Sequence, residues 1–361
     1  MIRTLSILFV FALSHGAILG KAFHVYSPSS KTNTLWIVKA TPKGDSLMLE
    51  VSEKVELDFS GRVITAHPSK PLLYITATGG DPGKVPGAVV FLKKDGSYQK
   101  HQNINFNDGA CYLSLDRGNR HILGVSYGNG RLNVYPLDDQ GIPGKAVTTI
   151  DEGKKEAHCV LLPPDGKNVY IPYVKGNLAI LQYAYDGITG KVTPLKPKEA
   201  KPPLGSGPRH MAYHPTLPMV YFSNEQGIGL SSYRRETNGQ LKVEQDISIL
   251  PPGMSKIGLS ASDLLITPDG KFLYAGLRGH RQDFSRISRY RVLEDGKAEF
   301  LGITEADQVP WGLTLSPDSK FLLVSATTGA SLAAYRISKD GNLKRVATLA
   351  WDERMSDLVA R

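Results

Sequence analysis

Short runs of hydrophobic residues recur along this chain, and clusters of Gly, Pro, Asn and Asp separate them. The runs have the length of β-strands and are rich in Val, Ile, Leu and Tyr. No long stretch has the 3.6-residue period of an amphipathic helix. Runs of this kind, bounded by turn residues, are typical of strands. The pattern therefore predicts an all-β protein.

The predicted strands are organised in a repeat of about fifty residues, a period that is typical of propeller blades. Each unit has a turn residue before a strand, then a third strand that ends on a hairpin turn, mostly Asp-Gly or Asn-Gly. Such dipeptides between hydrophobic runs are strong hairpin signals. The turn residues that mark the six units are Pro68, Arg117, Pro164, Pro215, Pro268 and Pro317. Four antiparallel strands in a unit of this length predict one blade of a β-propeller.

A seventh blade can be assembled from the two ends of the chain. Residues 23–27, 35–41 and 47–55 form three predicted strands without an innermost partner, and residues 356–360 have the pattern to supply it. Closure by both termini removes the open edges that a sheet must otherwise protect. We therefore predict a single domain over residues 23–361, a seven-bladed β-propeller with four-stranded blades.

Residues 1–22 differ from the rest of the chain and are predicted to be a secretory signal peptide. Arg3 gives a positive start, residues 5–13 an apolar core, and Gly20-Lys21-Ala22 a small-x-small cleavage site. An uncleaved anchor or a buried first strand is the alternative. The prediction implies a periplasmic or secreted protein with no membrane association after cleavage, and cleavage lowers the formal net charge from +9 to +7.

Composition and the absence of certain motifs exclude several classes of function. The excess positive charge is scattered through loops, where the side chains either keep the surface hydrated or attract small anions. Nothing in the sequence resembles a nucleic-acid-binding module. Cys111 and Cys159 are too few for a disulfide framework and are more typical of small core residues than of a pair. Metal ligation has weak support in the sequence, and no Gly-x-Ser-x-Gly or phosphate-binding loop occurs, so we expect no metal or cofactor. A monomer is expected.

The repeat brings polar residues to one mouth of the central channel. The start of each innermost strand and the end of the second strand lie at the same end of an antiparallel hairpin. The first position holds Arg62, Cys111, His158, Arg209, Ser262 and Trp311, and the second holds Thr78, Tyr127, Val174, Glu225, Arg278 and Thr327.

Four of these residues, His158, Arg209, Glu225 and Arg278, form a predicted polar cluster at a concave site. Each also has a structural explanation: a hydrogen-bonded histidine, an ion pair within one blade, or a solvated loop arginine. We interpret His210 and His214 as structural, with side chains that point elsewhere.

The chain also resembles the seven-bladed lactonase family, which includes propeller-type 6-phosphogluconolactonases and fungal 3-carboxy-cis,cis-muconate lactonizing enzymes. The resemblance rests on residues 207–211 (Gly-Pro-Arg-His-Met), Asn224-Glu225, residues 261–263 (Ala-Ser-Asp) and the Cys-x-x-Ser-x-Asp of residues 111–116. It implies functional roles for His158, Arg209, Glu225 and Arg278. The chain departs from the family at Tyr112, where a His is usual, and at Trp311, where an Arg is usual.

Together these observations predict an exported, metal-independent hydrolase of an anionic or polyhydroxy lactone, similar to 6-phosphogluconolactonase. His158 or Glu225 would act as general base, and Arg209 and Arg278 would bind the anion and the developing oxyanion. The residues expected to contact substrate are Arg62, Tyr112, Tyr127 and Trp311. A muconate-type cycloisomerase and a non-enzymatic binding propeller are the alternatives.

Overall fold

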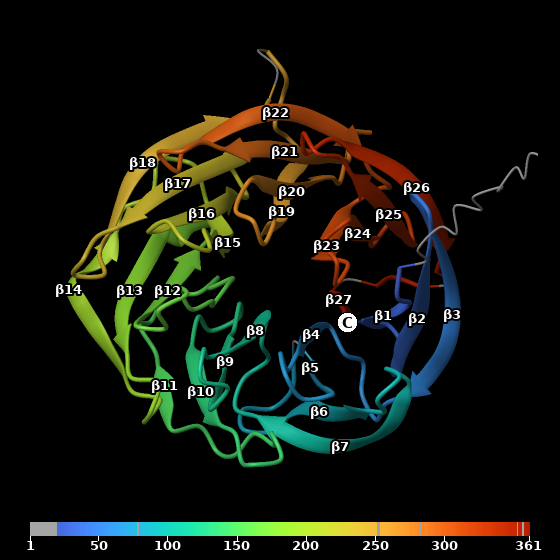
Figure 1. The fold of residues 1–361 in the computed structure, drawn as a ribbon. Coiled ribbons are helices and arrows are strands. Elements are labelled where there is room, and N and C mark those ends of the chain that lie inside the picture. Colours follow the sequence, from blue (N-terminus) through green and yellow to red (C-terminus); the bar gives the residue numbers. More distant parts are fainter. Residues whose placement is uncertain (1–19, 78, 251–252, 282, 352, 356) are drawn as a thin grey trace, which may run out of the picture.

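The computed structural model describes residues 20–361 except 78, 251–252, 282, 352 and 356. Its strands form seven antiparallel sheets arranged as blades around a central channel (Figure 1). The seven-bladed all-β architecture predicted from the repeat is thus confirmed. The signal peptide predicted over residues 1–22 lies almost wholly outside the described residues and stays a prediction.

The blades are numbered in chain order, and each is given from its innermost strand outward. Blade 1 consists of β4 (Val63–Ala66), β5 (Leu72–Thr76), β6 (Val85–Leu92) and β7 (Tyr98–Phe106). Blade 2 consists of β8 (Tyr112–Leu115), β9 (His121–Val125), β10 (Leu132–Pro136) and β11 (Thr148–Ile150). Blade 3 consists of β12 (Asn168–Tyr173), β13 (Ala179–Tyr185) and β14 (Val192–Ala200), with a 3₁₀ turn, η1 (Lys175–Asn177), after β12.

The remaining blades complete the ring. Blade 4 consists of β15 (Pro208–Tyr213), β16 (Met219–Asn224), β17 (Gly229–Arg235) and β18 (Leu241–Ser248). Blade 5 consists of β19 (Leu259–Ile266), β20 (Phe272–Gly279), β21 (Arg286–Val292) and β22 (Ala298–Glu305). Blade 6 consists of β23 (Pro310–Leu315), β24 (Phe321–Ala326), β25 (Ser331–Ile337) and β26 (Leu343–Ala350). Blade 7 consists of β27 (Val359–Ala360), β1 (Phe23–Pro28), β2 (Thr34–Lys43) and β3 (Ser46–Glu56).

Blade 3 differs from the others at its innermost position. There the segment from Ala157 to Leu161 is joined to β12 by two isolated bridges, Ala157 to Tyr173 and Leu161 to Tyr170. The backbone N–H of His158 donates to the carbonyl of Pro172 at 3.0 Å, but Pro172 has no N–H to return. The inner segment therefore keeps its place in the blade without a continuous ladder.

The ring closes as predicted, by the two ends of the chain. The short strand β27 pairs antiparallel with β1, with Val25 opposite Ala360 and Tyr26 opposite Val359. Backbone hydrogen bonds of 2.8 and 2.9 Å between His24 and Arg361 extend this pairing by one residue. The C-terminal strand thereby becomes the innermost strand of blade 7 (Figure 1).

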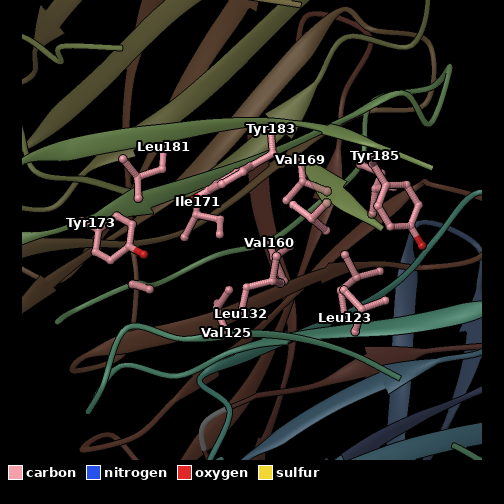
Figure 2. Close-up of a cluster of buried hydrophobic side chains, with 14 of the residues drawn as sticks. Leu123, Val125, Leu132, Val160, Val169, Ile171, Tyr173, Leu181, Tyr183 and Tyr185 are labelled. Atoms are coloured by element: carbon pink, nitrogen blue, oxygen red, sulfur yellow. The ribbon is translucent and has the colours of Figure 1, made fainter. Parts of the chain in front are cut away.

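Hydrophobic side chains fill the space between neighbouring blades. Between blades 2 and 3, Leu123 and Val125 of β9 face Val169 and Ile171 of β12 across a buried layer (Figure 2). Burying a side chain of this size stabilises the fold by roughly 1.5–3 kcal/mol. Similar clusters join the other blades, so each blade depends on its neighbours for burial.

A tyrosine hydrogen bond recurs between blades. In five places a tyrosine of the strand next to the innermost one donates to the carbonyl of the hairpin-turn glycine of the following blade. The pairs are Tyr26 with Gly96, Tyr74 with Gly141, Tyr170 with Gly239, Tyr221 with Gly296 and Tyr274 with Gly341. These glycines have positive φ, so the same residue shapes the turn and presents its carbonyl to the neighbouring blade.

The first prediction concerns this bond. Tyr221→Phe removes the 2.8 Å hydrogen bond to Gly296 and leaves a buried carbonyl without its donor, so the free energy of unfolding should fall by about 1–2 kcal/mol. Tyr233 of the same blade is equally buried, but its hydroxyl has no partner among the described residues. Urea unfolding of Tyr233→Phe is therefore the matched control and should match the wild type; equal losses in both variants would contradict the role of the bond.

The second prediction concerns Asp357, which joins the closing strand to blade 1. Its carboxylate accepts the N–H of Ile64 at 2.9 Å, and its backbone carbonyl accepts the hydroxyl of Ser27 at 2.6 Å. Burial raises the pKa of this carboxyl to about 7.

Because the folded pKa lies above the unfolded value of about 4, the stability from Asp357 should decline as pH rises from about 4 through 7. Asp357→Asn removes this titration. The melting temperature of the wild type should therefore fall more steeply than that of Asp357→Asn between pH 5 and 8 in parallel thermal scans. Superimposable slopes would show that Asp357 does not titrate in this range.

Candidate functional site

A cavity of about 790 Å³ occupies the central channel and is lined mainly by the innermost strands. All eight residues predicted from sequence line it: Arg62, Tyr112, Tyr127, His158, Arg209, Glu225, Arg278 and Trp311. The other mouth positions predicted from the repeat are confirmed only at Cys111, which also lines the cavity. Ser262, Val174 and Thr327 do not line the cavity, and Thr78 lies outside the described residues.

Bulges at the mouth explain the placement of His210 and of Ser262. In blade 4 the register shifts between Pro208 and Met211, so that Arg209 and His210 together oppose Ser223. A bulge breaks the alternation of side chains between the two faces of a strand. Both Arg209 and His210 consequently line the cavity, and the prediction that His210 points elsewhere is wrong.

Blades 5 and 6 carry bulges at the same level. In blade 5, Ser262 and Asp263 together oppose Gly276, and Ser262 turns to the carbonyl of Pro310, to which it donates at 2.8 Å. A side chain at Gly276 would collide with the hydroxyl of Ser262. Asp263 takes the place at the cavity wall that sequence reasoning gave to Ser262. In blade 6 the extra residue is Trp311.

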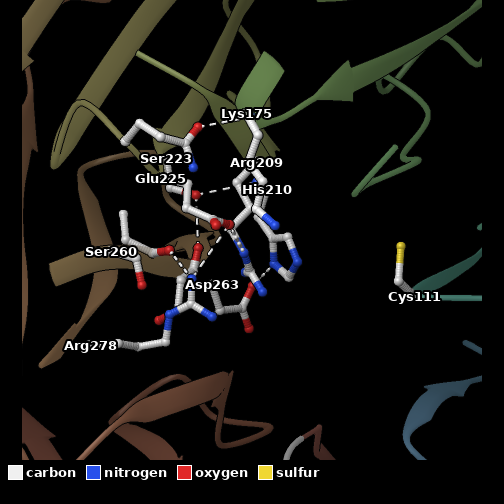
Figure 3. Close-up of polar contacts among 12 residues, drawn as sticks. Cys111, Lys175, Arg209, His210, Ser223, Glu225, Ser260, Asp263 and Arg278 are labelled. Carbon is white, nitrogen blue, oxygen red and sulfur yellow. Dashed lines mark hydrogen bonds and ion pairs between the residues drawn. The ribbon is translucent and has the colours of Figure 1, made fainter. Parts of the chain in front are cut away.

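Two buried arginines share one carboxylate at the mouth (Figure 3). Nε of Arg209 lies 2.9 Å and Nη2 of Arg278 lies 3.4 Å from the same oxygen of Glu225. Nη2 of Arg278 also donates to the carbonyl of Ala261 at 2.8 Å. Nη1 of Arg209 and Nε of Arg278 are buried with no hydrogen-bond partner among the described residues. The pair thus keeps unused donors and a surplus of positive charge.

The ring of Trp311 lies close to three guanidinium groups. It lies 4.7 Å from the guanidinium of Arg278, 5.5 Å from that of Arg209 and 5.3 Å from that of Arg62, distances typical of cation–π contact. Burial and the neighbouring Arg209 lower the pKa of Arg278 to about 9, which still leaves it protonated at neutral pH. The mouth is therefore a cationic site with an aromatic face.

His158 is buried between two other rings. Its imidazole makes edge-to-face contacts with Tyr127, at 5.6 Å between ring centroids, and with His210, at 5.2 Å. Burial and the positive charge of Arg209 place the pKa of His158 well below its usual range. The ring is consequently neutral at physiological pH, and its Nδ1 has no hydrogen-bond partner within the described part of the chain.

His210 is held by Asp263, a residue that sequence reasoning did not single out for the site. Nδ1 of His210 lies 2.6 Å from a carboxylate oxygen of Asp263 (Figure 3). The ring of Tyr112 packs edge-to-face on the imidazole, with 5.1 Å between the ring centroids. Burial and Arg209 lower the pKa of His210, while Asp263 opposes this shift. His214 is structural, as predicted: its Nδ1 accepts backbone N–H groups of Thr216 and Leu217.

Cys111 and Cys159 are free thiols. The sulfhydryl of Cys111 donates to the carbonyl of Ala157 at 3.1 Å, and burial raises the pKa of this thiol to about 12. Burial raises the pKa of Cys159 as well. Thiols held protonated in this way are weak nucleophiles, so both cysteines serve as packing residues.

Two features, a metal-binding cluster and a membrane-spanning helix, are absent from the described residues. Within them, no group of three or more His, Cys, Asp or Glu side chains is arranged to hold a metal ion. They also contain no helix that is long and apolar enough to cross a membrane.

The chain is 27% identical over 323 residues to the 6-phosphogluconolactonase of Cronobacter sakazakii, covering 88% of this chain and 92% of the relative. It is 27% identical over 336 residues to the enzyme of the same name from Pectobacterium carotovorum, covering 91% and 94%.

Among solved structures, the periplasmic gluconolactonase of Pseudomonas aeruginosa superimposes with a TM-score of 0.82 at 19% identity, covering 94% of this chain and 99% of the other. The family model described as lactonase, 7-bladed beta-propeller, matches residues 30–355. The chain therefore belongs to the seven-bladed β-propeller lactonase family, as its motifs suggested.

Proposed function

We propose that this protein is an exported hydrolase of an anionic sugar lactone and that it works without a metal ion. The observation that carries the proposal is the pair of buried arginines with unused donors at the mouth of a 790 Å³ cavity. The family is one of lactonases, and relatives that align over most of the chain are named 6-phosphogluconolactonase. The predicted signal peptide is the argument for export.

The charges favour a substrate with a negative group. Arg62, Arg209, Arg278 and Lys175 line the cavity, and the two buried arginines, Arg209 and Arg278, share the single carboxylate of Glu225. A phosphate or carboxylate can accept the free donors of the two buried arginines, and the face of Trp311 can support a sugar ring. Tyr112 and Tyr127 of blade 2 also line the cavity and add aromatic and hydroxyl surface for a polyhydroxy substrate.

The same arginines suit the chemistry of lactone opening. Attack of water on the lactone carbonyl places a negative charge on the carbonyl oxygen, and a preorganised donor can stabilise that oxyanion by about 3 kcal/mol. Glu225 holds Arg209 and Arg278 in place through contacts of 2.9 and 3.4 Å. Because one carboxylate oxygen of Glu225 is engaged by both guanidinium groups, Glu225 fits an orienting role better than that of a general base.

The proposal is tested on the purified full-length protein in a pH-stat assay that records acid release. The substrates are D-glucono-1,5-lactone, its 6-phosphate and an enol-lactone of muconate type, each with its spontaneous hydrolysis subtracted. We expect acceleration of the phosphorylated lactone above that of the neutral one. Turnover of the enol-lactone alone would favour the cycloisomerase, and no acceleration of any substrate would leave a binding propeller.

The third prediction concerns Arg278. Arg278→Gln removes a cation facing the oxyanion, so kcat should fall by roughly 10²–10³-fold while KM changes much less. Arg234 is the matched control, because it is a half-exposed arginine on β17 that pairs with Glu244 far from the channel. Arg234→Gln should keep wild-type kinetics. A change in KM with unaltered kcat in Arg278→Gln would assign this residue to ground-state binding only.

A further inference from the structure

His210 and Asp263 form a fixed pair on the cavity wall. Besides His210 at 2.6 Å, the carboxylate of Asp263 accepts the backbone N–H groups of Leu264 and Leu313, both at 2.8 Å. Burial opposes ionisation of Asp263, but His210 and these N–H groups outweigh it and lower the pKa of the carboxyl. An ionised acceptor at Nδ1 requires that Nδ1 of His210 carry the proton. The lone pair of the neutral ring is therefore on Nε2.

Nε2 of His210 is buried and has no hydrogen-bond partner among the residues that the structure describes. It lies on a ring that contacts His158, whose Nδ1 is also buried and unpartnered. Buried polar atoms are almost always hydrogen-bonded, to protein or to water or ligand. Two such nitrogens on adjoining rings in one cavity wall indicate a place where a water molecule or a substrate oxygen binds.

The alternative bases are less well placed to accept a proton. Glu225 is held by two guanidinium groups, which both contact the same carboxylate oxygen and engage it in ion pairs. His158 has its backbone anchored by Pro172, but among the described residues it has no carboxylate partner to stabilise an imidazolium. Among the three candidates, only His210 is paired with a carboxylate that can stabilise the charge it would acquire.

We propose that His210, oriented by Asp263, is the general base of the lactone hydrolysis, an inference that rests on the proposed function. The oxygen of a water molecule forms a bond to the lactone carbonyl carbon while one of its protons passes to Nε2 of His210. The carbonyl oxygen takes the negative charge beside Arg278. The bond from the carbonyl carbon to the ring oxygen then breaks, the ring oxygen receives the proton from Nε2, and a hydroxy acid results.

Asp263 acts here as a positioning residue. It fixes the tautomer and the ring orientation of His210, and its negative charge stabilises the imidazolium that forms in the transition state. The groups that face His210 and influence its protonation are Asp263, Arg209, Arg278, His158 and Tyr112.

The fourth prediction tests this assignment in the pH-stat assay. His210→Gln should lower kcat by about 10²–10⁴-fold, the usual contribution of general base catalysis. His101→Gln, on the outer strand β7, is the matched control and should keep wild-type activity. The melting temperature of each variant verifies that the propeller is folded.

The pH profile of Asp263→Asn supplies the second readout. The activity of a general base falls as pH falls through its pKa, and the charge of Asp263 raises the pKa of His210. Removing that charge should lower kcat and also move the acid limb of kcat/KM to lower pH. Glu225→Gln should leave the position of this limb unchanged.

The outcomes separate the inference from the proposed function. A wild-type protein that accelerates no lactone refutes the proposed function itself. If the wild type is active, two results would refute only the role of His210. One is a His210→Gln activity within about fivefold of the wild type, and the other is an acid limb of kcat/KM that does not move in Asp263→Asn. If His210→Gln does not fold, the pH profile of Asp263→Asn decides. Addition of imidazole to His210→Ala should restore part of the activity, because the cavity can admit it.

Discussion

Closure of the ring is the constraint on which the rest of the structure depends. Each blade buries its hydrophobic faces only against its two neighbours, so a break at any one interface would expose two of them. At the join between the chain ends, β27 contributes only Val359 and Ala360 to the sheet. Two hydrogen bonds beside this strand strengthen the closure. Asp357 accepts one from Ile64 of blade 1 and one from Ser27 of blade 7, so it connects the two blades. The cavity exists because the ring is closed.

Ring closure also explains how charged groups can be buried at the site. Arg209 and Arg278 are almost fully buried, and an unpaired buried charge is costly. Glu225 compensates part of that cost, but one carboxylate cannot fully neutralise the guanidinium groups of both Arg209 and Arg278. The stability gained between the blades has to offset the remainder. A substrate anion would complete the neutralisation, so the free site is electrostatically prepared for a ligand of that charge.

The sequence predicts the architecture well because the signals for it are local and repeated. Asp-Gly and Asn-Gly turns and strand-length hydrophobic runs recur in register, so seven blades and the closure by residues 356–360 follow from periodicity. The same register places Arg209, Glu225 and Arg278 at one mouth. The inner segment of blade 3 is less regular than its hydrophobic pattern suggests, because Pro172 lacks an N–H to share.

The β-bulges at the mouth could not be predicted from the periodicity of the sequence. A single extra residue in β15 or β19 leaves the hydrophobic pattern almost unchanged, but it decides which of two consecutive side chains faces the channel. Strict alternation assigned His210 to the wrong face and chose Ser262 over Asp263. Gly276, opposite the bulge in β19, is the one local signal, since a glycine within a strand often marks a bulge or a close approach.

The bulges have a consequence for the chemistry of the cavity. Without them, each innermost strand would present one residue at the mouth, and β15 and β19 would offer Arg209 and Ser262 there. With them, blade 4 presents a cation and an imidazole side by side, and blade 5 presents the carboxylate that binds that imidazole. An oxyanion-binding group and a proton acceptor need to lie on either side of one reacting carbonyl. Consecutive residues on a bulged strand meet this requirement with a fixed spacing, because the rigid sheet holds both backbones.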